Sequence, residues 1–170
     1  VISILSNAVV QSGIRTVVKG MGNKPLANRF DALLRSKLNM ESYLHETNVE
    51  ELLHTLRKSP PDMVLVDEEI GYATVERATS PINTIVNELR KDYRTVDVPV
   101  VVVVEPGRKE KAKEAYESDE RKVWVIAANI GAVALQKAVV EPIFEGKDDS
   151  KTLATRLASE AAEGLSYLSS

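Results

Sequence analysis

Apolar residues are clustered along the chain, and the clusters alternate between two spacings. Compact apolar runs, which are typical of buried β-strands, are each followed by a stretch in which apolar residues recur every three or four positions, as on one face of an amphipathic helix. The predicted strands are Ile14 to Val18, Ser42 to His45, Asp62 to Asp67, Val98 to Val104 and Lys122 to Ala127. We expect a helix after each of them.

The predicted helices begin and end at residues that suit helix termini. Pro25 and Pro81 fit a first helical turn, where a missing N–H is harmless. Asn48 fits the N-cap of the helix between them. A charged helix with a solvated surface is expected between the fourth and fifth strands. The last helix of the series is expected over Ala132 to Val140, because Pro142 disfavours its continuation.

The order of these elements predicts the fold class. Alternating strands and helices favour right-handed crossovers and a parallel sheet covered by helices on both faces. Val98 to Val104 is apolar at consecutive positions, as a strand buried on both faces must be. We therefore expect an α/β fold with three αβα layers, and the flavodoxin-like strand order 2-1-3-4-5 is the common solution at this size.

Segments outside the five strand–helix units are expected to form additional helices. Residues 1–13 are predicted to be a short amphipathic flanking helix, with a strand as the open alternative. Residues 14–144 would form the main domain, and residues 145–170 a polar linker followed by a C-terminal amphipathic helix. Because the chain begins with Val1 rather than methionine, we expect it to be part of a longer protein.

Composition narrows the classes of function. The chain has 170 residues, of which 44% are hydrophobic and 28% charged, with a net charge of −3, so we expect a soluble globular protein with no nucleic-acid partner. The longest apolar run is strand-sized and contains Pro99, so no membrane span is predicted. The absence of cysteine excludes thiolate chemistry and weakly favours the cytoplasm.

The stretch VVKGMGNKP, Val17 to Pro25, is the first candidate for a binding site. A strand that runs into a glycine-bearing loop and then a helix can cradle phosphate on backbone N–H groups. The stretch contains Gly20 and Gly22 but not the third glycine of a dinucleotide-binding loop. It also lacks the lysine followed by serine or threonine of the Walker motif. A turn with no ligand and a weak anion site with Lys24 beside it are both compatible with this stretch.

A second pattern is more specific. The segment DMVLVD ends in Asp67 at the carboxyl end of the third strand, and VPVVVVV and KVWV follow as the fourth and fifth strands. In pattern, order and spacing the chain resembles bacterial response-regulator receiver domains from Ile14 to about Phe144. The resemblance implies that Asp67 occupies the position of the aspartate that accepts a phosphoryl group.

The resemblance also implies a magnesium site, which this sequence does not match. Receivers carry two acids at the end of the first strand, and Mg²⁺ needs several oxygen ligands to neutralise a transferring phosphoryl group. Here the matching stretch is Lys19 to Asn23, KGMGN, and the first acidic residue of the chain, Asp31, falls in the following helix. We therefore expect no metal and no other cofactor.

Two further parts of receiver chemistry are missing from the sequence. The hydroxyl residue expected at the end of the fourth strand is matched by Val104, with Glu105 next to it. The lysine expected at the end of the fifth strand is matched by Ala127 or Ala128. Since phosphoryl transfer depends on charge stabilisation and positioning, the prediction is a degenerate receiver, or pseudo-receiver.

These patterns favour a non-enzymatic signalling or protein-interaction module. The only histidines, His45 and His54, have no serine–acid arrangement beside them, so no catalytic residue is predicted. The alternative function is a sensor that binds a small molecule or nucleotide at the carboxyl ends of the strands. The candidate crevice residues are Gly20, Gly22, Glu68 and Glu105, beside Asp67.

Partners are expected to be another protein or a second copy of the chain. By analogy with receivers, the contact face would include Lys111 to Glu117 and Val133 to Val140. The flanking segments also resemble single helices of the HEAT-type repeat, and a receiver-like module joined to such repeats is similar to certain large bacterial proteins of the planctomycete type. An acidic cluster at Asp67, Glu68 and Glu69 could bind a cation or could be a solvated strand end.

Overall fold

The computed structural model describes residues 14–73 and 79–145. The flanking helix predicted over residues 1–13, and the C-terminal helix and most of the linker predicted over residues 145–170, lie outside the described residues. The strands are β1 (Arg15–Gly20), β2 (Met40–Glu46), β3 (Met63–Asp67), β4 (Val100–Val104) and β5 (Val123–Ala127). The helices are α2 (Lys24–Lys37), α3 (Val49–Lys58), α4 (Pro81–Lys91), η1 (Pro106–Arg108), α5 (Lys109–Tyr116), α6 (Ala132–Leu135), η2 (Gln136–Val140) and α7 (Glu141–Phe144).

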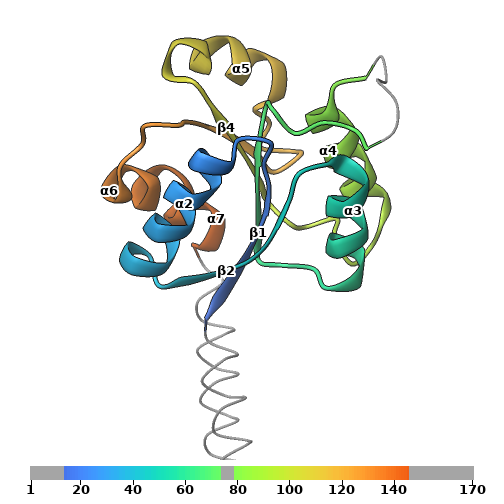
Figure 1. The fold of residues 1–170 in the computed structure, drawn as a ribbon, viewed down its shortest axis with the longest axis horizontal. Helices are drawn as coiled ribbons and strands as arrows, with labels where there is room; N and C mark the ends of the chain where they lie inside the picture. The colour runs from blue at the N-terminus through green and yellow to red at the C-terminus, as the bar shows by residue number, and fades with distance from the viewer. Residues whose placement is uncertain (1–13, 74–78, 146–170) are drawn as a thin grey trace, which may run out of the picture.

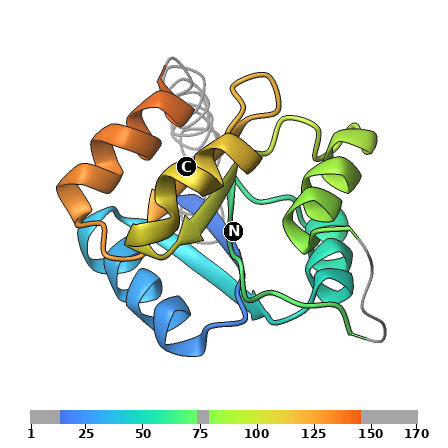
Figure 2. The ribbon, with the colours of Figure 1, turned by 90° about the horizontal axis from the view of Figure 1, so that it is seen from above.

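The strands form one parallel sheet in the order β2-β1-β3-β4-β5, which confirms the predicted topology. Figure 1 shows α2, α6 and α7 on one side of the sheet and α3 and α4 on the other. The view from above in Figure 2 shows the same separation, with the sheet running between the two groups. The fold is therefore the expected αβα sandwich, and the carboxyl ends of all five strands meet at one edge.

Each face of the sheet packs its own hydrophobic cluster. One cluster joins α3, α4 and α5 to alternate strand residues such as Val64 and Val66, and the other joins α2 and the last helical segments to Met63 and Leu65. All five residues of β3 and of β4 are buried. Consecutive apolar positions therefore serve two opposite faces, as the sequence predicted.

Side-chain caps fix where two helices begin. Asn48 Oδ1 accepts a hydrogen bond from the backbone N–H of Glu51 at 2.9 Å, so the predicted N-cap of α3 is present. Asn23 caps α2 in the same way and accepts from the N–H of Leu26 at 3.0 Å. The sequence pattern predicts that α2 starts at Pro25 and does not predict this cap, because Asn23 follows directly on a glycine-bearing loop.

Several predicted boundaries differ from the structure, most of them by one or two residues, and two differences affect the interpretation of the fold. β1 continues to Gly20 rather than ending at Val18, because Lys19 and Gly20 still pair with both β2 and β3. The last helix does not end before Pro142 but continues to Phe144. The segment before the proline, η2, is π-helical, and its wider turns change the hydrogen-bond pattern at the point where a proline would otherwise interrupt an α-helix.

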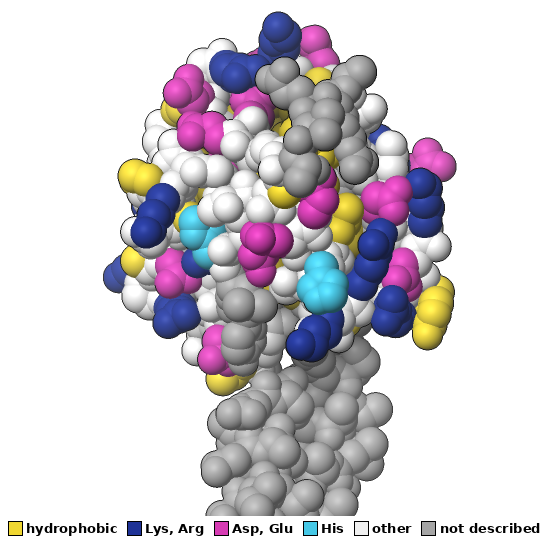
Figure 3. Space-filling view, turned by 45° about the vertical axis from the view of Figure 1, so that its right-hand side comes forward, with side chains coloured by type: hydrophobic (Ala, Val, Ile, Leu, Met, Phe, Trp, Pro, Cys, Tyr) yellow, Lys and Arg dark blue, Asp and Glu magenta, His cyan; other side chains and the backbone are white. Residues whose placement is uncertain are grey.

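The exposed hydrophobic side chains of the described residues are few and scattered. Among the described residues, the exposed large hydrophobic side chains are Tyr93, Val96 and Val133, which belong to two separate segments of the chain. On the visible part of the α3–α4 side in Figure 3, acidic and basic side chains are interspersed and hydrophobic ones are scattered. Within the described ranges no helix has the length and apolar character needed to cross a membrane.

Candidate functional site

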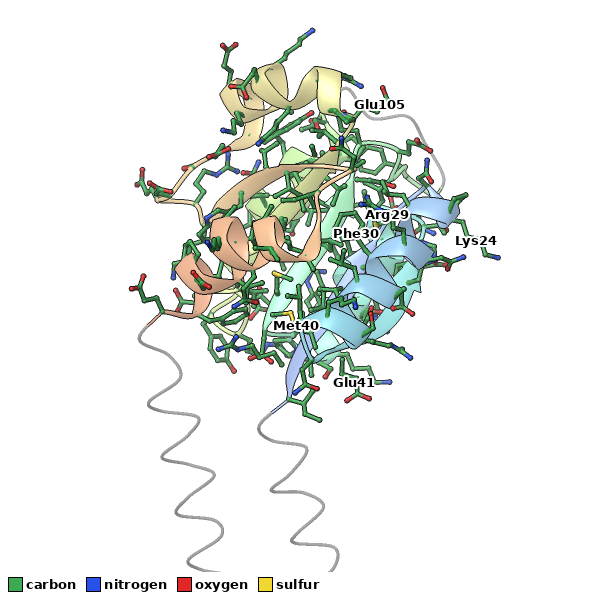
Figure 4. All side chains as sticks on the ribbon, turned by 90° about the vertical axis from the view of Figure 1, so that its left-hand side faces the viewer. Lys24, Arg29, Phe30, Met40, Glu41 and Glu105 are labelled. Atoms are coloured by element: carbon green, nitrogen blue, oxygen red, sulfur yellow. The ribbon has the colours of Figure 1, made fainter. Side chains whose placement is uncertain are left out.

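The loops that follow β1, β3, β4 and β5 enclose an open groove of about 730 Å³ at the carboxyl edge of the sheet. The start of α2 forms one wall, and Val103 to Pro106 with Arg108 form part of another. Figure 4 labels Arg29 on α2 and Glu105 above it, at the end of the fold where β4 terminates. Parallel α/β sheets bind ligands at this kind of edge.

Asp67 lies at the base of this groove, but its carboxylate is already fully engaged. The residue is only 2% exposed. Its Oδ1 accepts hydrogen bonds from the backbone N–H groups of Gly22 at 2.8 Å and Glu69 at 3.1 Å. Its Oδ2 accepts from the N–H of Asn23 at 2.9 Å. Both oxygens therefore anchor the loop after β1 to the end of β3.

The two glycines of this loop permit close packing. A Cβ atom at Gly22 would lie 2.1 Å from the carbonyl oxygen of Glu69, so only glycine fits against that backbone. A Cβ at Gly20 would lie 2.3 Å from a terminal methyl of Leu52. Because Asp67 takes the N–H groups of Gly22 and Asn23, these donors are not available to a bound anion in this structure.

The neighbouring acids Glu68 and Glu69 point to different partners. Glu68 forms an ion pair with Arg108, with 3.1 Å between Oε2 and Nη1. Glu69 Oε1 accepts a hydrogen bond from the side-chain amide of Asn23 at 2.9 Å. In the part of the chain that the structure describes, no group of three or more histidine, cysteine or acidic residues is arranged to hold a metal ion.

Glu105 is the predicted crevice residue whose charge is unpaired. It follows β4, is exposed and lines the groove, and its carboxylate has no hydrogen bond or ion pair with any described residue. Behind it, Val104 pairs in register with Ala127, and the N–H of Ala128 donates to the Val104 carbonyl at 2.7 Å. The ends of β4 and β5 thus present small or apolar side chains to the groove.

Two side-chain contacts that shape this edge could not be predicted from the sequence. Arg29 crosses from α2 to the loop after β5, where its Nη2 donates to the carbonyl of Ile130 at 2.8 Å. His45 Nε2 lies 2.7 Å from the carbonyl of Met21. Both contacts end on backbone oxygens of distant loops, and no sequence pattern identifies such partners.

The first acid of the chain, Asp31, belongs to an ion pair beneath the site. Lys19 is 6% exposed, and its Nζ lies 2.5 Å from Asp31 Oδ1. Burial opposes ionisation of Asp31, but the hydrogen bond and charge of Lys19, together with the charge of Arg35, hold the pKa of this carboxyl below its ordinary value. Asp31 therefore joins α2 to β1 and does not line the groove.

Comparison with known proteins identifies the fold. No protein-family model and no curated protein matches the chain. A CheY-like response-regulator receiver domain from Methylobacillus flagellatus is 16% identical, with a TM-score of 0.56 over 76% of this chain and 98% of that one. The receiver domain of a Pseudomonas aeruginosa sensor histidine kinase, solved with magnesium in its active-site cleft, is also 16% identical, with a TM-score of 0.56 over 76% and 96%.

A third solved structure agrees with these two. The signal receiver domain of a modulated diguanylate cyclase from Desulfovibrio desulfuricans is 18% identical, with a TM-score of 0.56 over 83% of this chain and 98% of that one. The chain therefore has the fold of a response-regulator receiver domain and spans nearly the full length of these domains.

Proposed function

We propose that this domain is a pseudo-receiver: a signalling or protein-interaction module that keeps the receiver fold and does not accept a phosphoryl group. The observation that carries the proposal is the state of Asp67. A phosphoacceptor must present a carboxylate oxygen to a phosphodonor and a metal ion. Asp67 is 2% exposed, and three backbone N–H groups occupy its oxygens.

The remaining strand ends support the same proposal. The residues after β1 are Met21 and Gly22, which offer no carboxylate for a magnesium ion. Val104 and Ala127 end β4 and β5, so neither a hydroxyl nor an ammonium group is available there to stabilise transferred charge. On this proposal the acid cluster of Asp67, Glu68 and Glu69 is not a cation site.

The proposal extends to the context of the module. Residues 14–144 form the receiver-like domain, and residues 1–13 and 145–170 connect it to neighbouring parts of a larger bacterial protein, of which HEAT-type repeats are one candidate. The module acts in the cytoplasm through a protein partner or a second copy. The distant relatives are signalling domains by their names, which supports this role.

A direct test is to incubate the protein with Mg²⁺ and acetyl phosphate and to measure its intact mass. We expect no adduct, because the Asp67 oxygens are bonded to backbone N–H groups and no metal cage adjoins them. A stoichiometric gain of one phosphoryl group that is absent in Asp67→Asn would overturn the proposal. A known receiver domain treated in parallel verifies that the phosphodonor is active.

The alternative function is a sensor of a small molecule or nucleotide, and the open groove is the observation that favours it. Thermal shift against nucleotides, cyclic dinucleotides and divalent ions separates the two functions, because a ligand that binds the folded state raises the melting temperature. A shift of several degrees from a nucleotide would favour the sensor. A concentration-dependent mass in solution without such a shift would favour the interaction module.

A further inference from the structure

Several hydrogen-bond donors of the groove at the carboxyl edge of the sheet are already engaged within the domain. The N–H groups of Gly22 and Asn23 are bonded to Asp67. The guanidinium of Arg108 is paired with Glu68, and that of Arg29 donates to a backbone carbonyl. An anion that bound the N–H groups of Gly22 or Asn23 would have to displace the Asp67 carboxylate.

Acceptors and negative charge, in contrast, remain available. The charged lining residues are four acids, Asp67, Glu68, Glu69 and Glu105, and two arginines, Arg29 and Arg108, so the lining carries two more negative than positive charges. Asp67 and Glu68 already have strong partners. Glu105 has none among the described residues and is exposed at the rim. The groove therefore presents one carboxylate, that of Glu105, that can still accept hydrogen bonds from a cation with several donors.

The wall next to these charges is apolar. Its residues come from α2, β4 and the loops after β4 and β5: Pro25, Leu26, Val103, Val104, Pro106 and Ala128. A surface of this kind suits the aliphatic stem of a lysine or arginine, which packs on apolar atoms while its charged head stays near water. Ala128 is small, so its own side chain takes up little of the groove.

We propose that this groove docks a basic segment of a partner protein, with one lysine or arginine side chain lying along the apolar wall and its charged head at Glu105. The inference rests on the proposed role as an interaction module and adds the surface and the chemistry of the partner. Glu69 contributes to the negative field that attracts the segment. A metal ion is a poorer occupant, because the groove acids do not converge on one point.

The test uses the ¹⁵N-labelled full chain and capped peptides of one apolar sequence that contain either a single lysine or a single glutamine. We expect the lysine peptide to shift amide resonances of Glu105, Arg108, Ala128 and Asn129, and the glutamine peptide to bind more weakly. Glu105→Gln should raise the dissociation constant of the lysine peptide by about two- to fivefold, the range of one exposed ion pair. Added salt should weaken binding to the unmodified protein.

The matched control is Glu110→Gln, which removes an equally exposed carboxylate on α5 outside the groove. Equal effects of the two substitutions, equal binding of the two peptides, or no groove shifts at all would overturn the inference. The inference would also be overturned if inorganic phosphate shifted the same resonances at lower concentration. It would be overturned as well if free butylamine reproduced the Glu105-dependent shifts, because that result would point to a small amine. None of these outcomes bears on phosphorylation of Asp67, so the two proposals fail separately.

Discussion

At the residue scale, Asp67 lies at the carboxyl end of β3, where the sequence resemblance predicts a phosphoacceptor, and its carboxylate has the bonds of a structural anchor. Its position at the end of a buried strand could be predicted, because the run DMVLVD is a clear sequence pattern. Its partners could not, because Gly22 and Asn23 donate from their backbone, 45 and 44 residues away. Local sequence predicts where a strand ends, whereas long-range backbone contacts depend on the folded topology.

We predict that Asp67→Asn lowers the free energy of unfolding by about 1–3 kcal/mol, because the amide NH₂ cannot accept the backbone N–H groups that one carboxylate oxygen now satisfies. Urea denaturation monitored by circular dichroism measures the change. Glu105→Gln is the control, and we expect it to fall within about 0.5 kcal/mol of the unmodified protein. An unchanged stability of Asp67→Asn would show that these three hydrogen bonds contribute little.

At the element scale, β1 and α2 are joined by the ion pair of Lys19 and Asp31. The amphipathic pattern of α2 is evident in the sequence, and Ala27, Phe30 and Leu34 of this helix are buried. The burial of Lys19 on β1, the second strand of the sheet order, does not follow from the sequence, because the apolar run predicts that β1 ends at Val18. The end of the last helix is a second example. Pro142 predicts that the helix stops before it, but the π-helical segment before the proline allows the helix to continue.

The ion pair makes stability depend on pH in a defined direction. The pKa of Asp31 is held below its ordinary value of 3.8 in the folded state, so its contribution is present above about pH 4 and is lost as the pH falls through the folded-state pKa. At neutral pH, Asp31→Asn should cost roughly 1–3 kcal/mol, because Lys19 is left buried without a charged partner. As the pH falls below 3.8 and through the folded-state pKa, the stability of the variant and that of the unmodified protein should converge.

Denaturant unfolding between pH 7 and pH 3 measures this convergence. Asp119→Asn, which changes an exposed carboxyl far from the ion pair, is the comparison and should follow the unmodified protein at every pH. Parallel curves for Asp31→Asn and the unmodified protein over the acidic range would contradict the assignment of pH dependence to this pair.

At the scale of the whole molecule, the described residues already contain a complete sheet and both hydrophobic clusters. The topology could be predicted because alternating strand and helix periods leave few possible arrangements. The sequence predicts only where the groove lies, since its volume, its Arg29 contact and its Glu68–Arg108 pair depend on how the four loops after β1, β3, β4 and β5 meet. The flanking segments lie outside what the structure describes, so the proposed domain boundaries need a separate test.

We predict that a fragment of residues 14–145 folds by itself and unfolds in one cooperative transition, because both hydrophobic clusters of the described residues lie within it. Circular dichroism and a dispersed ¹H–¹⁵N spectrum measure folding. The comparison fragment, residues 14–128, lacks Leu135, Val139, Val140, Ile143 and Phe144, and should fail to fold because one face of the sheet loses its cover. A 14–145 fragment that remains unfolded would show that the flanking segments complete the core.

The hydrogen bonds at Asp67 also affect how this sequence would be interpreted in a genome. A carboxylate that holds two loops together supports the folded structure whether or not any chemistry takes place there. An aspartate at the end of β3 is therefore by itself no evidence of phosphotransfer. Sorting such proteins into active and inactive signalling components requires asking what the carboxylate is bonded to, in addition to whether it is present.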